Sequence, residues 1–409
     1  MTKVQNTENC RSRSLSPNEC GFRSLARMNG QWRGKFSGST NGEITVNIDE
    51  RPSWYEGIAY LHSDDSKNIP SVAASFRTSG KDHSFKVRTN GVLPIDPFSG
   101  FPVLLPIWEE RIKKHYPANV TISSWADVTG SWENNDLKLS WKTDIGLEGD
   151  CTLTRLAAGQ PSELVPLKKN WHEYKEYVAG SEGRNYLFRG QNEPWRLRTS
   201  FHRAGRADIW RFTREDIPEL HRHLSSRTKH LFNLKDADEN GGFFNLIQHH
   251  GYPTPILDWT YSPYVAAFFA YRHISDKRVA RSEPADVVRV LIFDQAQWRA
   301  DYKQLVVLSP ATLHFSVAEF IAVENERMIP QQAASTVTNI DDIESYIKLK
   351  ESEQKKTYLS AIDLPVNERK VVVNELRRMG ITAGSLFPGL DGMCEELRER
   401  NFELTGHHL

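Results

Sequence analysis

The segment Tyr186–Gln191 combines a short apolar run with an arginine, a glycine and a glutamine. A strand that ends in Arg189 would hold a guanidinium at the edge of a sheet, where its planar fork matches two oxygens of a phosphate or carboxylate. Gly190 has no side chain and would let a ligand approach the backbone. With Gln191, these residues form a candidate anion site, although a surface arginine is the commoner explanation for so short a motif.

Residues 248–270 carry the densest group of candidate functional side chains. A helix is expected to end at Gly251, and another to begin after Ser262, because serine caps helices and proline fits the first helical turn. Asp258 and Thr260 are then predicted to lie in a turn at a helix N-terminus, where free N–H groups suit an anion.

Other roles are open for the acidic and basic residues of this segment. Asp258 would cap the backbone locally or pair with Arg189, and His249 or His250 would exchange protons near neutral pH. A packed structural histidine explains each of the two slightly better when it is taken singly. Neighbouring histidines point to different helix faces and no acidic residue stands at a zinc-like spacing, so no metal site is expected.

Two further polar groups have two explanations each. Glu324, Glu326, Arg327, Gln331 and Gln332 would line a pocket near a strand end or form a solvated loop. Residues 184–227 hold ten arginines and no lysine. This arginine-rich stretch would bind a polyanion or nucleotide, or form a solvated helix face paired with local carboxylates.

The elements that must position these side chains follow from the periodicity. Helical spacing is expected at 171–180, 245–251, 262–274, 340–350 and 367–380, and a buried strand at 287–294. This mixed α and β pattern defines a predicted domain at 168–405, after a linker marked by Pro161 and Pro166.

A different pattern occupies residues 28–157, where eight short runs alternate apolar and polar residues between turn signals such as Asn90-Gly91. Such runs predict an antiparallel β-barrel or sandwich. The fold class is therefore α+β, with an N-terminal antiparallel β-barrel and a flexible tail at 1–27. The tryptophans of this region would form an aromatic cup for a ligand or, more commonly, pack its core and rim. They are Trp32, Trp54, Trp125, Trp132 and Trp141.

Composition excludes several classes of protein. The 409 residues carry 52 basic and 52 acidic side chains, so the net charge of zero argues against a globally basic nucleic-acid coat. Apolar runs long enough for a membrane helix are absent from the sequence. Four scattered cysteines argue against a disulfide framework and a cysteine zinc site, and the cytoplasm is the expected compartment. The oligomeric state has no signal in the sequence.

Three motifs resemble those of a known family. Phe188-Arg189-Gly190-Gln191 is similar to the signature that names the FRG domain of bacterial and phage proteins. The run QHHGYPTPILDWT at 248–260 resembles the family's Q-H-x-G-x-P-T-R-L-L-D-W-T, and residues 325–332 its N-x-R before a glutamine-rich turn. The resemblance covers about residues 170–400. Pro255 stands where the family usually has arginine, which removes an anion contact, and Ala333 where it commonly has glycine.

The resemblance implies a layout similar to that of ADP-ribosyltransferases, with NAD as the substrate and a role in phage defence or as a toxin. Arg189 would hold the NAD phosphates or ribose, and Gln331 would stand where such enzymes carry a glutamate. Glu324 and Glu326 lie close enough in sequence to replace that glutamate. The nucleotide site would also include Gly190, Gln191, His249, Asp258 and Thr260.

The acceptor in such a reaction would be a protein or an RNA. A second hypothesis is a non-catalytic module that binds a nucleotide or nucleic acid through the arginine-rich stretch. A third is a structural interaction protein.

Overall fold

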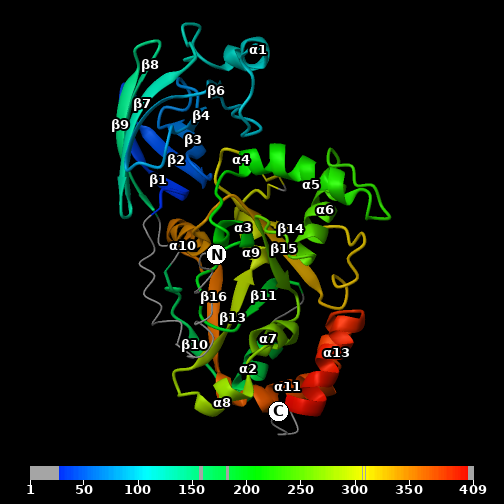
Figure 1. Cartoon of the computed structure of the whole chain (residues 1–409). Coiled ribbons are helices and arrows are strands. Elements are labelled where there is room, and N and C mark those ends of the chain that lie inside the picture. Colours follow the sequence, from blue (N-terminus) through cyan, green and yellow to red (C-terminus); the bar gives the residue numbers. More distant parts are fainter. Residues whose placement is uncertain (1–26, 156–159, 181–183, 306, 309, 404–409) are drawn as a thin grey trace, which may run out of the picture.

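A computed structural model describes residues 27–155, 160–180, 184–305, 307–308 and 310–403 (Figure 1). Of the predicted tail, only Arg27 falls within these ranges. The described chain is α+β, as the sequence predicted. An antiparallel sheet forms the N-terminal region and a mixed sheet with helices forms the rest.

The N-terminal sheet has nine antiparallel strands in the order β5-β7-β8-β9-β1-β2-β3-β4-β6, and it curls into what we call the half-barrel. The Asn90 N–H donates to the Ser75 carbonyl, and the Val92 N–H to that of Ser124, so backbone contacts bridge the gap between the two edges. The strands are β1 (Gly30–Gly38), β2 (Gly42–Glu50), β3 (Tyr55–Ser63), β4 (Val72–Arg77), β5 (Ser84–Arg88), β6 (Val92–Pro94), β7 (Ala126–Glu133), β8 (Asp136–Thr143) and β9 (Glu148–Arg155).

Alternation along these strands sends apolar residues to the concave face. Trp32, Leu137 and Leu153 are fully buried there and form the floor of the half-barrel. Outside, Arg77 lies 3.7 Å from the ring centre of Trp54, and Arg88 lies 3.7 Å from that of Trp125. Most of the tryptophans therefore pack the core or the rim. Trp141 alone among the five lines the cavity described below.

The connection from β6 to β7 contains three short helical turns. These are α1 (Leu105–Ile107), a π-turn η1 (Trp108–Ile112) and a 3-10 turn η2 (Lys113–His115). Trp108 is fully buried and anchors this segment at the side of the half-barrel.

The C-terminal sheet has seven strands in the order β10-β16-β13-β11-β12-β15-β14. Strand β10 runs parallel to β16, and the other neighbours are antiparallel. In chain order the strands are β10 (Leu167–Lys168), β11 (Tyr186–Gln191), β12 (Ile256–Thr260), β13 (Val287–Asp294), β14 (Phe315–Ala318), β15 (Ala333–Thr338) and β16 (Leu359–Pro365). The prediction of a buried strand at 287–294 is confirmed by β13.

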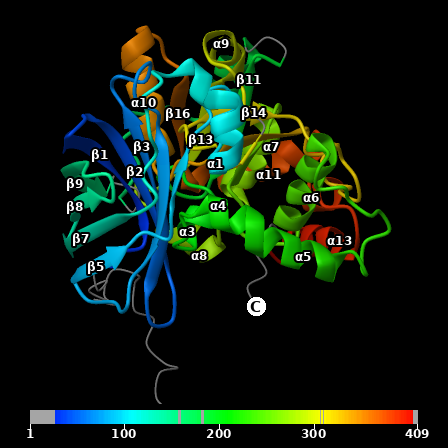
Figure 2. The ribbon, with the colours of Figure 1, turned by 90° about the horizontal axis from the view of Figure 1, so that it is seen from above.

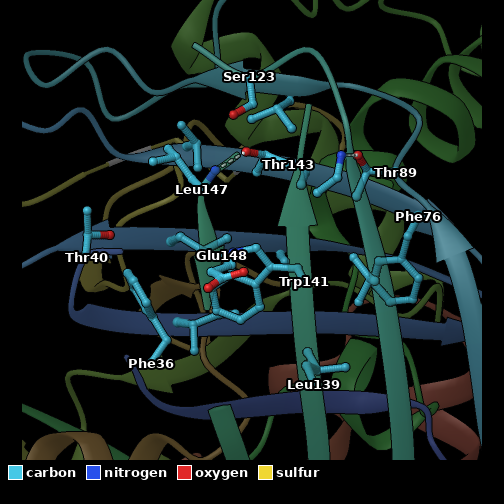
Figure 3. Close-up of a pocket in the computed structure, with 18 of the residues that line it drawn as sticks. Phe36, Thr40, Phe76, Thr89, Ser123, Leu139, Trp141, Thr143, Leu147 and Glu148 are labelled. Atoms are coloured by element: carbon cyan, nitrogen blue, oxygen red, sulfur yellow. Dashed lines mark hydrogen bonds between the residues drawn. The ribbon is translucent and has the colours of Figure 1, made fainter. Parts of the chain in front are cut away.

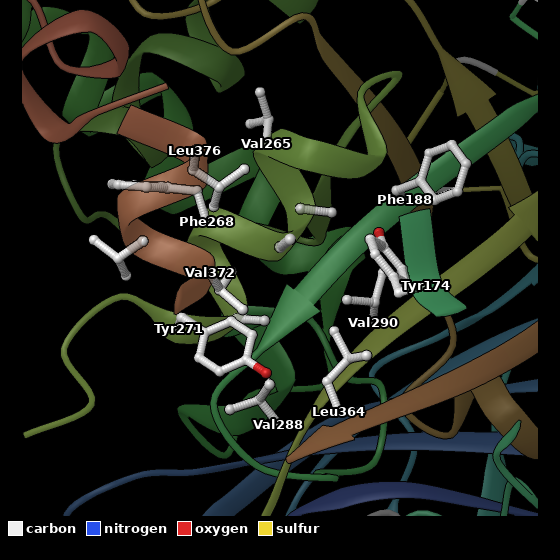
Figure 4. Close-up of a cluster of buried hydrophobic side chains, with 14 of the residues drawn as sticks. Tyr174, Phe188, Val265, Phe268, Tyr271, Val288, Val290, Leu364, Val372 and Leu376 are labelled. Atoms are coloured by element: carbon white, nitrogen blue, oxygen red, sulfur yellow. The ribbon is translucent and has the colours of Figure 1, made fainter. Parts of the chain in front are cut away.

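Helices cover both faces of this sheet. Trp171, Phe268 and Val372 bring α2, α7 and α11 onto one face (Figure 4), and Trp298 and Ile343 bring α9 and α10 onto the other. The longer helices are α2 (Trp171–Ala179), α5 (Ile217–Leu224), α6 (Ala237–His249), α7 (Pro263–Tyr271), α9 (Gln295–Asp301), α10 (Ile343–Gln354), α11 (Arg369–Arg378) and α13 (Leu390–Arg398). The shorter ones are α3 (Ser200–Arg203), α4 (Ile209–Arg211), the π-turn η3 (Phe212–Asp216), α8 (Asp276–Arg281), the 3-10 turn η4 (Val366–Glu368), α12 (Ala383–Leu386) and the π-turn η5 (Glu399–Glu403).

The start of α7 is as predicted, but the residues before it are not in a turn. Ser262 caps α7 by accepting from the Val265 N–H. Asp258 and Thr260 belong to strand β12, which pairs with β15. The apolar residues of this short segment are buried on both faces of the sheet, so β pairing prevails over the turn suggested by the flanking prolines.

Polar contacts join the half-barrel to the C-terminal region. The carboxylate of Asp49, fully buried on β2, accepts from the Arg206 guanidinium and from the Ala207 N–H at 2.8 Å. The Gln31 amide donates to the Asn339 carbonyl at 2.8 Å. Seen from above, the half-barrel lies beside α3, α4 and α10 (Figure 2). Among the described helices, none is both long and apolar enough to cross a membrane.

Candidate functional site

A polar cavity of about 300 Å³ opens where β11 and β12 meet α6 and the turn before β15. Six separate segments of the sequence therefore supply its walls. The described residues that line it are Phe188, Arg189, Gly190, Asn245, Gln248, His249, Asp258, Trp259, Thr260, Phe269, Asn325, Arg327, Met328, Gln331, Ala333 and Phe387.

Arg189 lies at the centre of the site, because it also lines two adjoining hollows. One guanidinium Nη donates to the backbone carbonyl of Asp258 on the neighbouring strand. Its Nε is buried without a hydrogen-bond partner among the described residues. Desolvation lowers the pKa of Arg189, and the nearby Asp258 carboxylate partly offsets this effect. The arginine is thus fixed in direction but keeps donor capacity for an anion.

Gly190 lines the cavity and also packs against a helix. A Cβ at this position would lie 1.9 Å from the Ala266 carbonyl oxygen and 2.5 Å from the Ala270 nitrogen of α7. The glycine therefore lets α7 press directly against β11, which places Arg189 at the cavity. On the Cβ side of Gly190 the close neighbour is therefore a helix of the same chain, and the approach of a ligand from the cavity stays a prediction.

Asp258 is held by two residues that the sequence analysis did not single out. Its carboxylate accepts from the Gln248 amide, and the Gln248 oxygen in turn accepts from the Thr254 hydroxyl. Desolvation raises the pKa of Asp258, while Arg189 and the Gln248 hydrogen bond oppose the rise. Asp258 is the only carboxylate among the described lining residues. The signal for its two partners was the QHHGYPT motif, in which the glutamine and threonine stand six residues apart.

His249 faces the same cavity from the end of α6. Desolvation and the positive charge of Arg327 lower its pKa to about 4, so the imidazole is neutral at pH 7 and can accept a proton. Asn325, buried on the opposite wall, donates its amide to Asn245 of α6. This bond ties the N-x-R motif to α6 and holds the two walls together.

Thr260 and Gln331 connect β12 to the turn before β15. The Thr260 hydroxyl donates to the Gln331 carbonyl at 2.7 Å, and the Gln331 amide donates to the Leu386 carbonyl at 2.9 Å. Phe387 is thereby held over the cavity, where its ring lies edge-on to Phe269 at 5.9 Å. Nothing in the local sequence pointed to Phe387, because it reaches the site through the tertiary fold alone.

The structure places two of the expected site residues outside this cavity. The Glu324 carboxylate accepts from the His230 N–H, and Glu324 is not among the residues that line the cavity. Gln191 lines the adjoining hollow, and its side chain is buried. Arg189, Gly190, His249, Asp258, Thr260 and Gln331 are brought together.

That adjoining hollow is a wider groove of about 990 Å³, which meets the cavity at Arg189, Gly190 and Phe269. Most arginines around it are already paired. Arg196 binds Asp342, Arg198 binds Asp341 and Arg272 binds Glu395. Arg203 differs, because its hydrogen bond goes to the Arg198 carbonyl.

The arginine-rich stretch consequently serves two ends. Arg206 and Arg211 reach Asp49 and Glu56 of the half-barrel, in addition to Asp216 and Glu215 nearby. Part of the stretch thus forms the local pairs considered above, and part joins the two regions. Within the described ranges, no group of three His, Cys, Asp or Glu side chains could hold a metal ion.

The fold and site define an α+β protein with a polar, arginine-centred cavity. The FRG domain family model matches residues 184–278, which include β11, α6, β12 and α7. The chain therefore carries an FRG domain. A search of the curated proteins gives no match.

Among solved structures, similar chains are the redesigned β-barrel mFAP1 bound to DFHBI and a de novo designed fluorescence-activating β-barrel. The first is 11% identical, covers 31% of this chain and 94% of its own, and has a TM-score of 0.21. The second is 15% identical, covers 31% and 92%, and has a TM-score of 0.19. TM-scores this low support no conclusion about this protein.

Proposed function

We propose that the cavity binds NAD and that the FRG domain transfers its ADP-ribosyl group to an acceptor. The observation that carries the proposal is the convergence of Arg189, His249, Asp258 and Gln331, from four separate segments, on one cavity. Strands β11, β12 and β15, which carry or follow these residues, are neighbours in the sheet. This arrangement suits the layout that the resemblance implied.

Size also supports a dinucleotide. A cavity of about 300 Å³ holds one end of such a molecule, and the adjoining groove of about 990 Å³ has room for the remainder. Arg189 lies between the two, where the diphosphate would pass, and a guanidinium is suited to phosphate oxygens. Phe269 and Phe387 offer apolar ring surfaces to a planar base.

In the proposed reaction the bond between ribose C1′ and the nicotinamide nitrogen breaks, and nicotinamide leaves with the electron pair. The acceptor forms a new bond to C1′, and its proton passes to neutral His249. Gln331 carries no charge, so the carboxylate of Asp258 is the group that would stabilise the cationic ribose. Gln248 and Thr254 act as positioning residues that aim the Asp258 carboxylate.

The test is transfer of label from NAD labelled in its adenylate part to proteins and RNA of a bacterial extract. Arg189→Ala and Asp258→Asn should each reduce labelling about 100-fold or more, because removal of one preorganised electrostatic contact costs that much. Arg222→Ala, on the exposed face of α5, is the matched control and should label normally. Transfer that survives Arg189→Ala would refute the site, and melting curves would show that each variant is folded.

A non-catalytic nucleotide or nucleic-acid module is the second candidate. Trp195, 52% exposed at the groove, and Arg203 favour it, because stacking surfaces and cations bind single strands. Binding of RNA that weakens steeply with salt, without label transfer, would support this function. The paired state of Arg196, Arg198 and Arg272 reduces the positive charge available for such binding.

A further inference from the structure

The concave face of the half-barrel encloses a second cavity, of about 180 Å³, which shares no lining residue with the Arg189 cavity. Side chains from all nine strands line it, most of them apolar, and Figure 3 shows Phe36, Leu139 and Trp141 among them. Leu61, Leu139 and Trp141 are only partly buried. Apolar surface therefore faces an open space where close packing would be expected.

Glycines on neighbouring strands make room for two of the rings that line the cavity. A Cβ at Gly130 would lie 2.2 Å from Cζ of Phe85, and one at Gly149 would lie 2.6 Å from Cζ2 of Trp141. Each ring consequently lies against a glycine backbone of β7 or β9 instead of pointing inward. The cavity is a consequence of these glycine and aromatic pairs.

Small residues on the opposite wall leave the space unfilled. The register aligns Val46 with Ala59, Ala59 with Ala74, and Ala74 with Val92 across β2, β3, β4 and β6. All four line the cavity. Side chains as short as these valines and alanines do not reach the aromatic residues on the opposite wall.

The cavity is closed at one end and polar at the other. Ile48 and Leu137 form its floor, beside the fully buried Trp32. Ser39, Thr40, Ser63 and Thr143 surround its mouth at the ends of β1, β3 and β8. The start of β1 carries Gln31, which contacts the C-terminal region, so the mouth lies at the end of the half-barrel that faces away from that region.

We propose that the half-barrel binds one compact, uncharged, mainly aromatic molecule that carries a hydrogen-bond acceptor at its outer end. Glu148 is the only charged residue among the described lining, and it lies at the mouth, where it repels anions. The hydroxyls of Ser39 and Thr143 accept from the N–H groups of Glu148 and Leu147 and keep their own protons to donate.

The volume fixes the size class of this molecule. An apolar cavity of about 150 Å³ is known to hold benzene, so about 180 Å³ accommodates one or two fused rings. A long acyl chain exceeds this space, and a fatty acid would also bring its carboxylate close to Glu148. This inference is independent of the chemistry proposed for the FRG domain.

The test is titration of the full chain with toluene, quinoline, pyrene and decanoate, followed by melting curves and by methyl NMR. Quinoline, which is neutral at pH 7 and carries a ring nitrogen as acceptor, should bind saturably and shift the methyl signals of Val46, Leu61 and Leu139. Toluene should bind more weakly than quinoline, and pyrene and decanoate at least about tenfold more weakly, because apolar pockets discriminate size by that order.

Two variants complete the test. Ala74→Phe fills the cavity and should weaken quinoline binding at least about tenfold, whereas Ser140→Phe, on the exposed outer face of β8, should not. The proposal is overturned if quinoline gives no saturable binding, if its methyl shifts fall outside the half-barrel, or if decanoate binds more tightly. Should Ala74→Phe fail to fold, the ranking of the four probes on the unaltered chain still decides.

Discussion

The two cavities of this protein differ in nearly every physical respect. The cavity at Arg189 is about 300 Å³, and its walls hold two arginines, a histidine, a carboxylate and several amides, most of them hydrogen-bonded to one another. The half-barrel cavity is about 180 Å³ and apolar except at its mouth. The first is built to fix charged and polar groups in direction, and the second to exclude water from an uncharged surface.

Glycine has opposite roles in the two regions. Gly190 lets two backbones touch, so that β11 and α7 form a rigid support below Arg189. Gly130 accommodates the end of a side chain, the ring of Phe85, which has free space beside it. The comparison suggests that the FRG domain is intolerant of added volume near its cavity, whereas the half-barrel can absorb it.

The largest effect is expected for Gly190→Ala. Its new methyl group meets backbone atoms of α7 that cannot move alone, so we expect a loss of more than about 4 kcal/mol in the free energy of unfolding. Urea denaturation followed by circular dichroism measures this loss. Gly251→Ala is the matched control, because an added Cβ there meets nothing within 4 Å and the cost comes from its φ of +83° alone. Equal losses in the two variants would contradict the packing role.

An intermediate effect is expected from acid on the buried His202. Burial lowers its pKa to about 4 from the ordinary 6.5, so the unfolded chain takes up a proton that the folded chain refuses. The contribution of His202 to the free energy of unfolding is complete above pH 6.5 and is lost as the pH falls through about 4. The total loss is about 3 kcal/mol. Asp208, whose pKa burial raises to about 7, acts in the opposite direction.

The contribution of His202 is isolated by His202→Gln. When the pH falls from 7 to 5, the unfolding free energy of the unaltered chain should decrease relative to that of this variant, because only the unaltered chain carries the histidine that takes up a proton on unfolding. Native-state hydrogen exchange should locate the difference in the C-terminal region. An unchanged difference would mean that the His202 pKa is ordinary. If amide hydrogen exchange on acidification increased first in the half-barrel, the acid effect would not belong to the C-terminal region, which contradicts the contrast drawn between the two regions.

The smallest effect is expected for Gly130→Ala. The Phe85 ring can move into the cavity, so we expect a loss of about 1 kcal/mol in unfolding free energy together with a smaller cavity. Urea denaturation measures the first and quinoline titration the second. A loss as large as that of Gly190→Ala would show that the half-barrel is as tightly packed as the FRG domain.

Local patterns predicted much of the fold and part of the site. Alternation predicted the antiparallel strands, and the Ser262–Pro263 pair predicted the start of α7. The motifs predicted Arg189, His249 and Asp258 as candidates, but the flanking prolines wrongly indicated a turn where strand β12 lies. Prolines mark local breaks, and they give no information about the sheet neighbours that hold β12 in place.

The sequence by itself determined which chemical groups were available: an arginine after an apolar run, an acid, a histidine and the glycines of the two regions. Only the tertiary structure decided which of them share a space. Contacts such as Gln331 with Leu386 and Gly190 with Ala266 join residues more than 50 positions apart. They depend on strand order and helix packing, and therefore on the burial of the whole core, which no local pattern records.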